Sequence, residues 1–301
     1  MNIFRVALDW TPNVNHIGFF IASELGYYTD LGLNVIISDP KSDNYKITPA
    51  KKVEINEADI ALCPLESVIS YRTKKNKFLL IAIATILKND LSAIVVKDSS
   101  IISPKYLDGK TYASYGARYE DKIIKRMIIN DGGVGNIKIN YPEKLGIWET
   151  IIKNKYDSTW IFLNWEGIEA QNLDINLNYF KMSDFDIPYS YSPVIVADER
   201  KIQKYPKDYV KFLNATKSGY LYCLNNLDNA TKILKKYMTI EDNAINLEKA
   251  LNLTNNFFGT EKDWGIMEQN NVKTFINWLK ENQLIEKNIY PNELFTNSLL
   301  I

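Results

Sequence analysis

Short apolar, β-branched segments alternate along the chain with segments whose apolar residues recur every three or four positions. The first kind predicts strands at residues 3–8, 34–38, 58–62, 79–85 and 93–97. The second kind predicts helices at 18–28, 48–56 and 66–75, the second of them with Thr48 as its N-cap and Pro49 at its first helical position. Strands that alternate with helices at this spacing predict βαβ units and a parallel sheet with helices on both faces.

The same alternation returns in the second part of the chain. We expect strands at 110–114, 137–141, 158–163 and 192–198, with helices at 116–131, 145–154 and 165–172, and a helical pattern from there to the end. This organisation predicts two lobes around a cleft. Residues 1–92 plus 193–301 form lobe one, residues 93–192 form an inserted lobe two, and the hinge lies near 92–98 and 190–198. We expect the tail beyond residue 260, with Trp264 and Trp278, to pack on lobe one.

Composition excludes several classes of function. Lys+Arg and Asp+Glu are both 36, which argues against a nucleic-acid or anionic-membrane partner, since both need a basic excess. Two cysteines and one histidine provide neither a disulfide framework nor a metal site with several histidines. No apolar run approaches the roughly 20 residues of a membrane span. Without a signal-peptide pattern at its start, the sequence as written predicts a cytoplasmic protein; a periplasmic or lipid-anchored location is expected if a signal peptide has been removed.

Polar and aromatic residues follow nearly every predicted strand. In open α/β sheets, ligands bind beyond the carboxyl ends of the strands. The candidate binding residues are therefore Asp9, Trp10, Asn13 and His16; Glu66 and Ser67; Tyr115, Gly116, Ala117, Arg118 and Tyr119; Trp165 and Glu166; and Tyr189 and Tyr191.

This residue set suits a flat, nitrogen-containing ring. The aromatic residues can stack on the ring, and Asp9 and Glu166 can accept hydrogen bonds from amino groups or a protonated ring nitrogen. The turn before the helix at 116–131, with Arg118, suits a phosphate, carboxylate or formyl oxygen.

Several of these residues also have purely structural interpretations. His16 can serve only as a local cap, and Glu66 and Glu120 can be partners of a helix dipole in the first helical turn. Cys63 is expected to be a small buried residue rather than a nucleophile. Trp148 and Trp160 are assigned to the core.

The segment "LDWTPNVNHIGFFIASELGYYTDLGLNV" resembles the opening of the thiamine-pyrimidine family. That family includes formylaminopyrimidine-binding proteins of bacterial ABC importers and the eukaryotic-type synthase of hydroxymethylpyrimidine phosphate. The resemblance extends over residues 3–260, through "ADIALCPLESVISYR", "LDGKTYASYGARYED", "STWIFLNWEGIEA" and "IPYSYSPVIVAD".

The resemblance implies a type II periplasmic-binding-protein-like clamshell, an α/β fold with two lobes of mixed sheets and a helical C-terminal segment. It also implies that Trp10 stacks on the pyrimidine and that Asp9 contacts the polar edge of the ring. The turn from Gly116 to Tyr119 would hold an anionic end, and Glu166 would reach the ring from the other lobe.

Departures from the synthase are equally informative. The synthase in this family binds pyridoxal phosphate through a lysine after the third strand, consumes one of its own histidines, and carries a cysteine-rich run. Here the corresponding places read Cys63, Glu66 and "YSYSP", with no lysine between Lys52 and Lys74. We therefore expect no catalytic residues, no metal and no cofactor, with pyridoxal phosphate only under the enzyme alternative.

The expected function is binding of a thiamine-precursor pyrimidine for uptake, salvage or biosynthesis. An ABC importer is the expected partner if the chain is exported, and we expect no membrane insertion. The alternatives are a cytosolic synthase-like enzyme and a clamshell for another small ligand, such as a sulfonate or nitrate.

Overall fold

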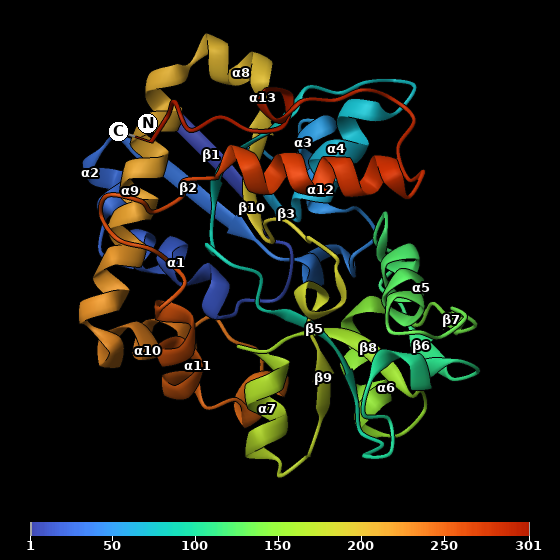
Figure 1. Cartoon of the computed structure of the whole chain (residues 1–301). Coiled ribbons are helices and arrows are strands. Elements are labelled where there is room, and N and C mark those ends of the chain that lie inside the picture. The colour runs from blue at the N-terminus through green and yellow to red at the C-terminus, as the bar shows by residue number, and fades with distance from the viewer. Residues whose placement is uncertain (1, 301) are drawn as a thin grey trace.

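The computed structural model describes residues 2–300, which form two five-stranded sheets (Figure 1). The first sheet has the order β2-β1-β3-β10-β4, and the second β7-β6-β8-β5-β9. The strands of the first sheet are β1 (Asn2–Ala7), β2 (Leu33–Ser38), β3 (Ile60–Cys63), β4 (Leu80–Thr85) and β10 (Val194–Asp198). Those of the second are β5 (Ser92–Val96), β6 (Thr111–Ala113), β7 (Lys138–Asn140), β8 (Ser158–Phe162) and β9 (Asn178–Phe180). Strand β9 has no counterpart among the predicted strands.

Both sheets are mixed, as the resemblance implied, and the parallel pairing predicted from the alternation of strands and helices holds for three strands of each sheet. Strands β2, β1 and β3 run parallel, as do β7, β6 and β8. Strand β10 is antiparallel to β3 and β4, and β5 is antiparallel to β8 and β9. Each of these two strands is the first in its sheet after the chain has crossed from the other sheet, so it enters from the opposite end.

The chain crosses between the sheets at residues 86–91 and 181–193. We call the part built on the first sheet lobe one and the part built on the second lobe two. The predicted hinge segments fall largely on β5 and β10, next to these crossings. The predicted lobe boundaries at residues 92 and 193 stay predictions.

Helices cover both faces of the first sheet (Figure 1). Alternate residues of β1 face opposite sides: Phe4 and Val6 pack with α1 and α9, whereas Ala7 belongs to the core beneath α3, α4 and α12. On the first side lie α1 (Ile17–Glu24), α2 (Tyr27–Asp30), α8 (Glu199–Lys204), α9 (Pro206–Asn225), α10 (Leu227–Lys235) and α11 (Leu247–Asn255). On the second lie α3 (Pro49–Glu54), α4 (Leu65–Thr73), α12 (Gln269–Glu281) and α13 (Pro291–Leu294). Because successive side chains of a strand point to opposite faces, the apolar run of β1 contributes to a core on each side of the sheet.

Lobe two is smaller and carries α5 (Glu120–Asn130), α6 (Ile147–Ile152) and α7 (Glu166–Asn172). The helix predicted at 116–131 begins only at Glu120, because residues 114–119 form a turn in which Gly116 has a φ of +67°. Short 3-10 helices complete the two lobes: η1 (Val14–His16), η2 (Pro40–Asp43), η3 (Pro104–Leu107), η4 (Lys144–Gly146), η5 (Met182–Phe185) and η6 (Glu241–Ala244).

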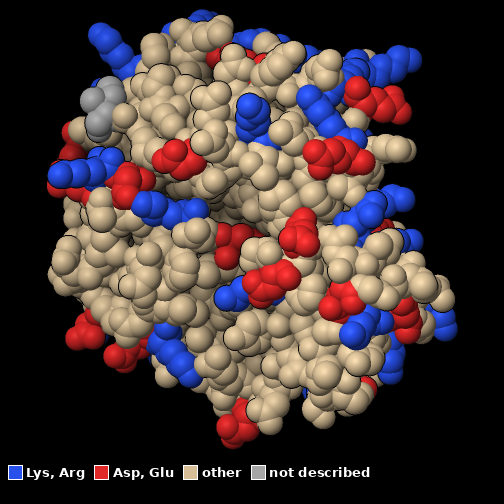
Figure 2. All heavy atoms as spheres, viewed as in Figure 1, with Lys and Arg blue, Asp and Glu red and all other residues tan. Residues whose placement is uncertain are grey.

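The C-terminal segment packs against the rest of the chain, as predicted. Trp264 is 2% exposed and Trp278 is 7% exposed, and both belong to hydrophobic clusters with residues of the first sheet. Within the described chain, no helix is long and apolar enough to cross a membrane. On the face seen in Figure 2, positive and negative side chains are interspersed rather than gathered by sign.

Candidate functional site

A cavity of about 410 Å³ lies between the two lobes, at the ends of β1, β3, β6 and β8 where the strand-end rule placed it. This volume is near the lower end of the roughly 300–1,000 Å³ typical of small-molecule sites. Most of the predicted residues line it: Asp9, Trp10, Asn13, Glu66, Ser67, Tyr115, Gly116, Ala117, Arg118, Trp165, Glu166 and Tyr189.

Three predicted residues do not line the cavity. His16 is fully buried behind Asp9. Tyr119 is 3% exposed and belongs to a hydrophobic cluster. The Tyr191 hydroxyl accepts hydrogen bonds from Glu268 N at 2.8 Å and Asn271 Nδ2 at 3.2 Å, and so anchors the start of α12 instead.

Aromatic rings form one end of the cavity. The Trp10 ring lies 5.7 Å from that of Tyr115 and 5.9 Å from that of Tyr45. Trp160 packs against a hydrophobic core cluster, as assigned, and also lines the cavity, with its ring 5.0 Å from that of Tyr189. Because Trp10 and Tyr45 belong to lobe one and Tyr115 to lobe two, this aromatic box, defined here as Trp10, Tyr45 and Tyr115, is assembled by the two lobes together.

His16 orients Asp9. Its Nδ1 accepts a hydrogen bond from Asn13 N at 3.3 Å, so the proton is on Nε2, which donates to Asp9 Oδ1 at 2.8 Å. The Tyr45 hydroxyl donates to the Asp9 carbonyl oxygen at 2.7 Å. The neutral imidazole of His16 therefore fixes the Asp9 carboxylate just beyond the end of β1. The lone histidine supports the site from behind the wall rather than lining it.

Three of the backbone donors expected in the turn after β6 already donate to groups of lobe two. Glu120 accepts hydrogen bonds from Tyr115 N and Ala117 N, both at 3.0 Å, and Gly116 N donates to Ser114 Oγ at 3.0 Å. The Tyr112 hydroxyl donates to the same Glu120 carboxylate at 2.8 Å. These three N–H groups are satisfied within lobe two, which weakens the expectation that the turn holds an anionic end.

Two further carboxyl groups are enclosed in the cavity wall. Burial, followed by the charge of Glu120, raises the pKa of Glu66 to about 8. Burial also raises the pKa of Glu166 to about 7, although its Oε2 accepts a hydrogen bond from Phe162 N at 3.0 Å. The wall therefore contains acids that a basic ligand group would hold in the ionised form.

Lys144 and Tyr45 are site residues that the sequence did not reveal. Lys144 lies in η4 of lobe two, and its Nζ sits 4.8 Å from the centre of the Tyr45 ring in lobe one. Burial lowers the pKa of Lys144. Of the described lysines, it alone lines the cavity, and it does not follow β3 as the synthase lysine would. Tyr45 follows β2 and Lys144 follows β7, two strand ends at which the sequence predicted no candidate residues.

A buried polar contact joins the lobes beside the cavity. Asn164, after β8 in lobe two, donates from Nδ2 to Asn15 Oδ1 at 2.8 Å and to Thr254 Oγ1 at 3.0 Å. Asn164 has no exposed surface, and Asn15 lines the cavity. The described arrangement is thus one in which the two lobes touch across the site.

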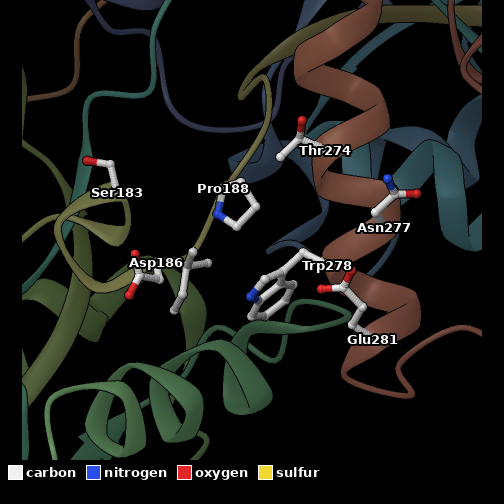
Figure 3. A pocket seen from close by; sticks show the side chains of 8 residues that line it. Ser183, Asp186, Pro188, Thr274, Asn277, Trp278 and Glu281 are labelled. Carbon is white, nitrogen blue, oxygen red and sulfur yellow. The ribbon is translucent and has the colours of Figure 1, made fainter.

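A second hollow of about 540 Å³ lies between α12 and the segment that contains η5. Figure 3 shows Trp278, Asn277, Thr274 and Glu281 on α12 opposite Asp186 and Pro188. It contains none of the predicted binding residues. Among residues 2–300, no group of three or more His, Cys, Asp or Glu side chains is placed to hold a metal ion.

Comparison with known proteins adds a family and a fold. The family model described as "NMT1/THI5 like" matches residues 13–230. A formylaminopyrimidine-binding protein from Halalkalibacterium halodurans is 23% identical, over 97% of this chain and 89% of that protein.

Solved structures with low identity agree in fold. An alkanesulfonate-binding protein from Xanthomonas axonopodis, bound to MOPS, superposes with a TM-score of 0.72 at 10% identity, covering 98% of each chain. A Candida albicans protein with the generic periplasmic-binding-protein fold has a TM-score of 0.73 at 15% identity, covering 99% of this chain and 97% of that one. The chain therefore has the periplasmic-binding-protein fold, as the sequence predicted.

Proposed function

Because this chain belongs to the NMT1/THI5-like family, we propose that it binds a small aminopyrimidine between its two lobes. The observation that carries the proposal is the aromatic box of Trp10, Tyr45 and Tyr115, with Asp9 and Glu166 beside it. A flat ring stacks on such walls, and carboxylates accept hydrogen bonds from amino groups at the ring edge.

Residues from both lobes take part in this site. Asp9 and Trp10 come from lobe one, and Tyr115 and Glu166 from lobe two. A ligand that touches both walls stabilises the closed arrangement, because those contacts are incomplete when the lobes separate. Capture by closure is the mechanism we propose.

The proposed biological role is the handling of a thiamine precursor. A relative whose name states that it binds formylaminopyrimidine supports this choice. An ABC importer is the partner we propose if the chain acts outside the cytoplasm. The cytoplasmic location expected from the sequence stays a prediction.

Calorimetric titration tests the proposal. We expect formylaminopyrimidine to bind, the matching pyrimidine without the ring amino group to bind more weakly, and an alkanesulfonate not to bind. The last expectation follows from the occupied N–H groups of Tyr115, Gly116 and Ala117. Binding of the sulfonate alone would favour a clamshell for another ligand.

Replacement of Trp10 tests the stacking wall. Stacking of a base on an aromatic side chain is worth about 1–3 kcal/mol, so Trp10→Ala is expected to weaken aminopyrimidine binding roughly 5- to 150-fold. Tyr106→Ala is the matched control, because Tyr106 is 46% exposed and lies outside the cavity. Thermal unfolding of both variants checks that they are folded. Unchanged affinity in a folded Trp10→Ala protein would remove Trp10 from the site.

A further inference from the structure

Glu66 presents an unpaired carboxylate oxygen in the cavity wall. The residue lies in the first turn of α4, lines the cavity and is only 3% exposed. Its Oε2 is buried and has no hydrogen-bond partner among the described residues. Buried polar atoms are normally paired, so an orphan in the wall of a ligand-sized cavity indicates a group that the ligand supplies.

No cation is among the described groups that shift the pKa of Glu66, and Arg118, which lines the same cavity, lies over the Tyr119 ring. Four groups interact electrostatically with Glu66: Glu120, Cys63, Tyr119 and Tyr189. Glu120 raises the pKa of Glu66, and the charge of Glu66 raises the pKa of the other three. Glu120 cannot be a partner, because its own oxygens accept hydrogen bonds from the turn after β6. Of the groups that a ligand could place beside Glu66, a cation gains most, because it favours the ionised form of the carboxyl group and pairs with its charge.

The charged residues that line the cavity as a whole also favour a positively charged ligand group. Its lining includes the acids Asp9, Glu66, Glu120 and Glu166, against the bases Arg118 and Lys144. Arg118 is exposed, and Lys144 lies over the Tyr45 ring rather than beside Glu66. An anionic group next to Glu66 would disfavour its ionised form still further, whereas a cation would favour it.

We propose that Glu66 forms a subsite for a protonated amino group of the ligand, separate from the ring subsite at the aromatic box. This inference rests on the proposed function. It assigns the ligand to a narrower chemical class, the aminopyrimidines that carry a basic aminoalkyl substituent. The N-acylated and phosphorylated forms of the same ring are expected to bind less tightly, because an amide has no positive charge and a phosphate has the wrong one.

The test compares three ligands that share one aminopyrimidine ring. They carry a primary amine, its N-formyl derivative, or a phosphate ester of a hydroxymethyl group. A hydrogen bond to a charged group predicts that the amine binds roughly 10- to 150-fold more tightly than the formyl derivative. We expect the phosphate ester to bind most weakly.

Glu66→Gln is the decisive variant, because it keeps the shape of the side chain and removes the charge. We expect it to lose the preference for the amine and to keep the affinity for the formyl derivative. Glu281→Gln, an exposed residue outside the cavity, is the matched control and should behave as the unmodified protein. If Glu66→Gln changes the affinity for all three ligands by the same factor, Glu66 has only a general role in the wall and the subsite is wrong.

A second readout needs no variant. Titrations near pH 7 in two buffers of different ionisation enthalpy count the protons exchanged on binding. The amine ligand should release protons because it holds Glu66 in the ionised form, whereas the formyl derivative should release fewer. Equal proton counts, together with equal affinities, would overturn the subsite and leave the binding of aminopyrimidines intact. Failure of every aminopyrimidine to bind would instead overturn the proposed function itself.

Discussion

Removal of the buried contact between the lobes should weaken ligand binding, although the replaced residue does not contact the ligand. Asn164 donates to Asn15 Oδ1 at 2.8 Å and to Thr254 Oγ1 at 3.0 Å, and it has no exposed surface. Asn164 itself does not line the cavity. Asn164→Ala deletes both hydrogen bonds and leaves the lobes otherwise unchanged.

The size of the effect follows from those two bonds. Each contributes about 1 kcal/mol net, so the closed arrangement should lose about 2 kcal/mol relative to the open one. That corresponds to about a 30-fold change in the closed-to-open ratio. Because the ligand binds the closed arrangement, its apparent affinity should fall by up to the same factor.

Calorimetry measures the affinity, and small-angle X-ray scattering measures the shape of the empty and ligand-bound protein. Asn172→Ala is the matched control: its Nδ2 donates to Ala244 O at 2.8 Å at an exposed position, where water can replace the lost bond. We expect the control to change binding by less than about 0.5 kcal/mol. An Asn164→Ala protein that is folded and binds within twofold of the unmodified chain would refute the reasoning.

Two further predictions concern stability. A Cβ atom at Gly219 of α9 would lie 2.0 Å from the carbonyl oxygen of Gly18 in α1, so Gly219→Ala should lower the free energy of unfolding by about 1–3 kcal/mol or more in urea denaturation. Gly146→Ala is its control, because nothing lies within 4 Å of the added atom; equal destabilisation of the two variants would contradict this packing. The second prediction concerns pH: with a pKa of about 8 in the folded chain against an ordinary value of 4.5, Glu66 keeps its proton when the unfolded chain has lost it. The free energy of unfolding of the empty protein should therefore fall as pH rises from about 4.5 to about 8, by at most about 1.4 kcal/mol per pH unit. Glu66→Gln should make this dependence on pH weaker. Identical slopes for the two proteins would show that Glu66 is already ionised in the folded protein.

Local pattern was enough to predict most of the elements and the position of the site. The short apolar run that became β1 and the helical spacing that became α1 are properties of the chain itself, independent of what packs against them. The strand-end rule brought Asp9 and Glu66 to one cavity wall, because the ends of the neighbouring strands β1 and β3 meet at one edge of a sheet. None of this required knowledge of contacts between the lobes.

Contacts between distant segments decided the rest. Lys144 meets the Tyr45 ring only because the lobes come together, and the antiparallel direction of β5 and β10 follows from the two crossings of the chain. Whether the turn after β6 can bind an anion depends on which protein groups already accept hydrogen bonds from its backbone N–H groups. A helix start favours an anion in general, but here Glu120 already fills that role. Sequence determines which donors and acceptors exist, whereas only the folded chain decides which of them are left for a ligand.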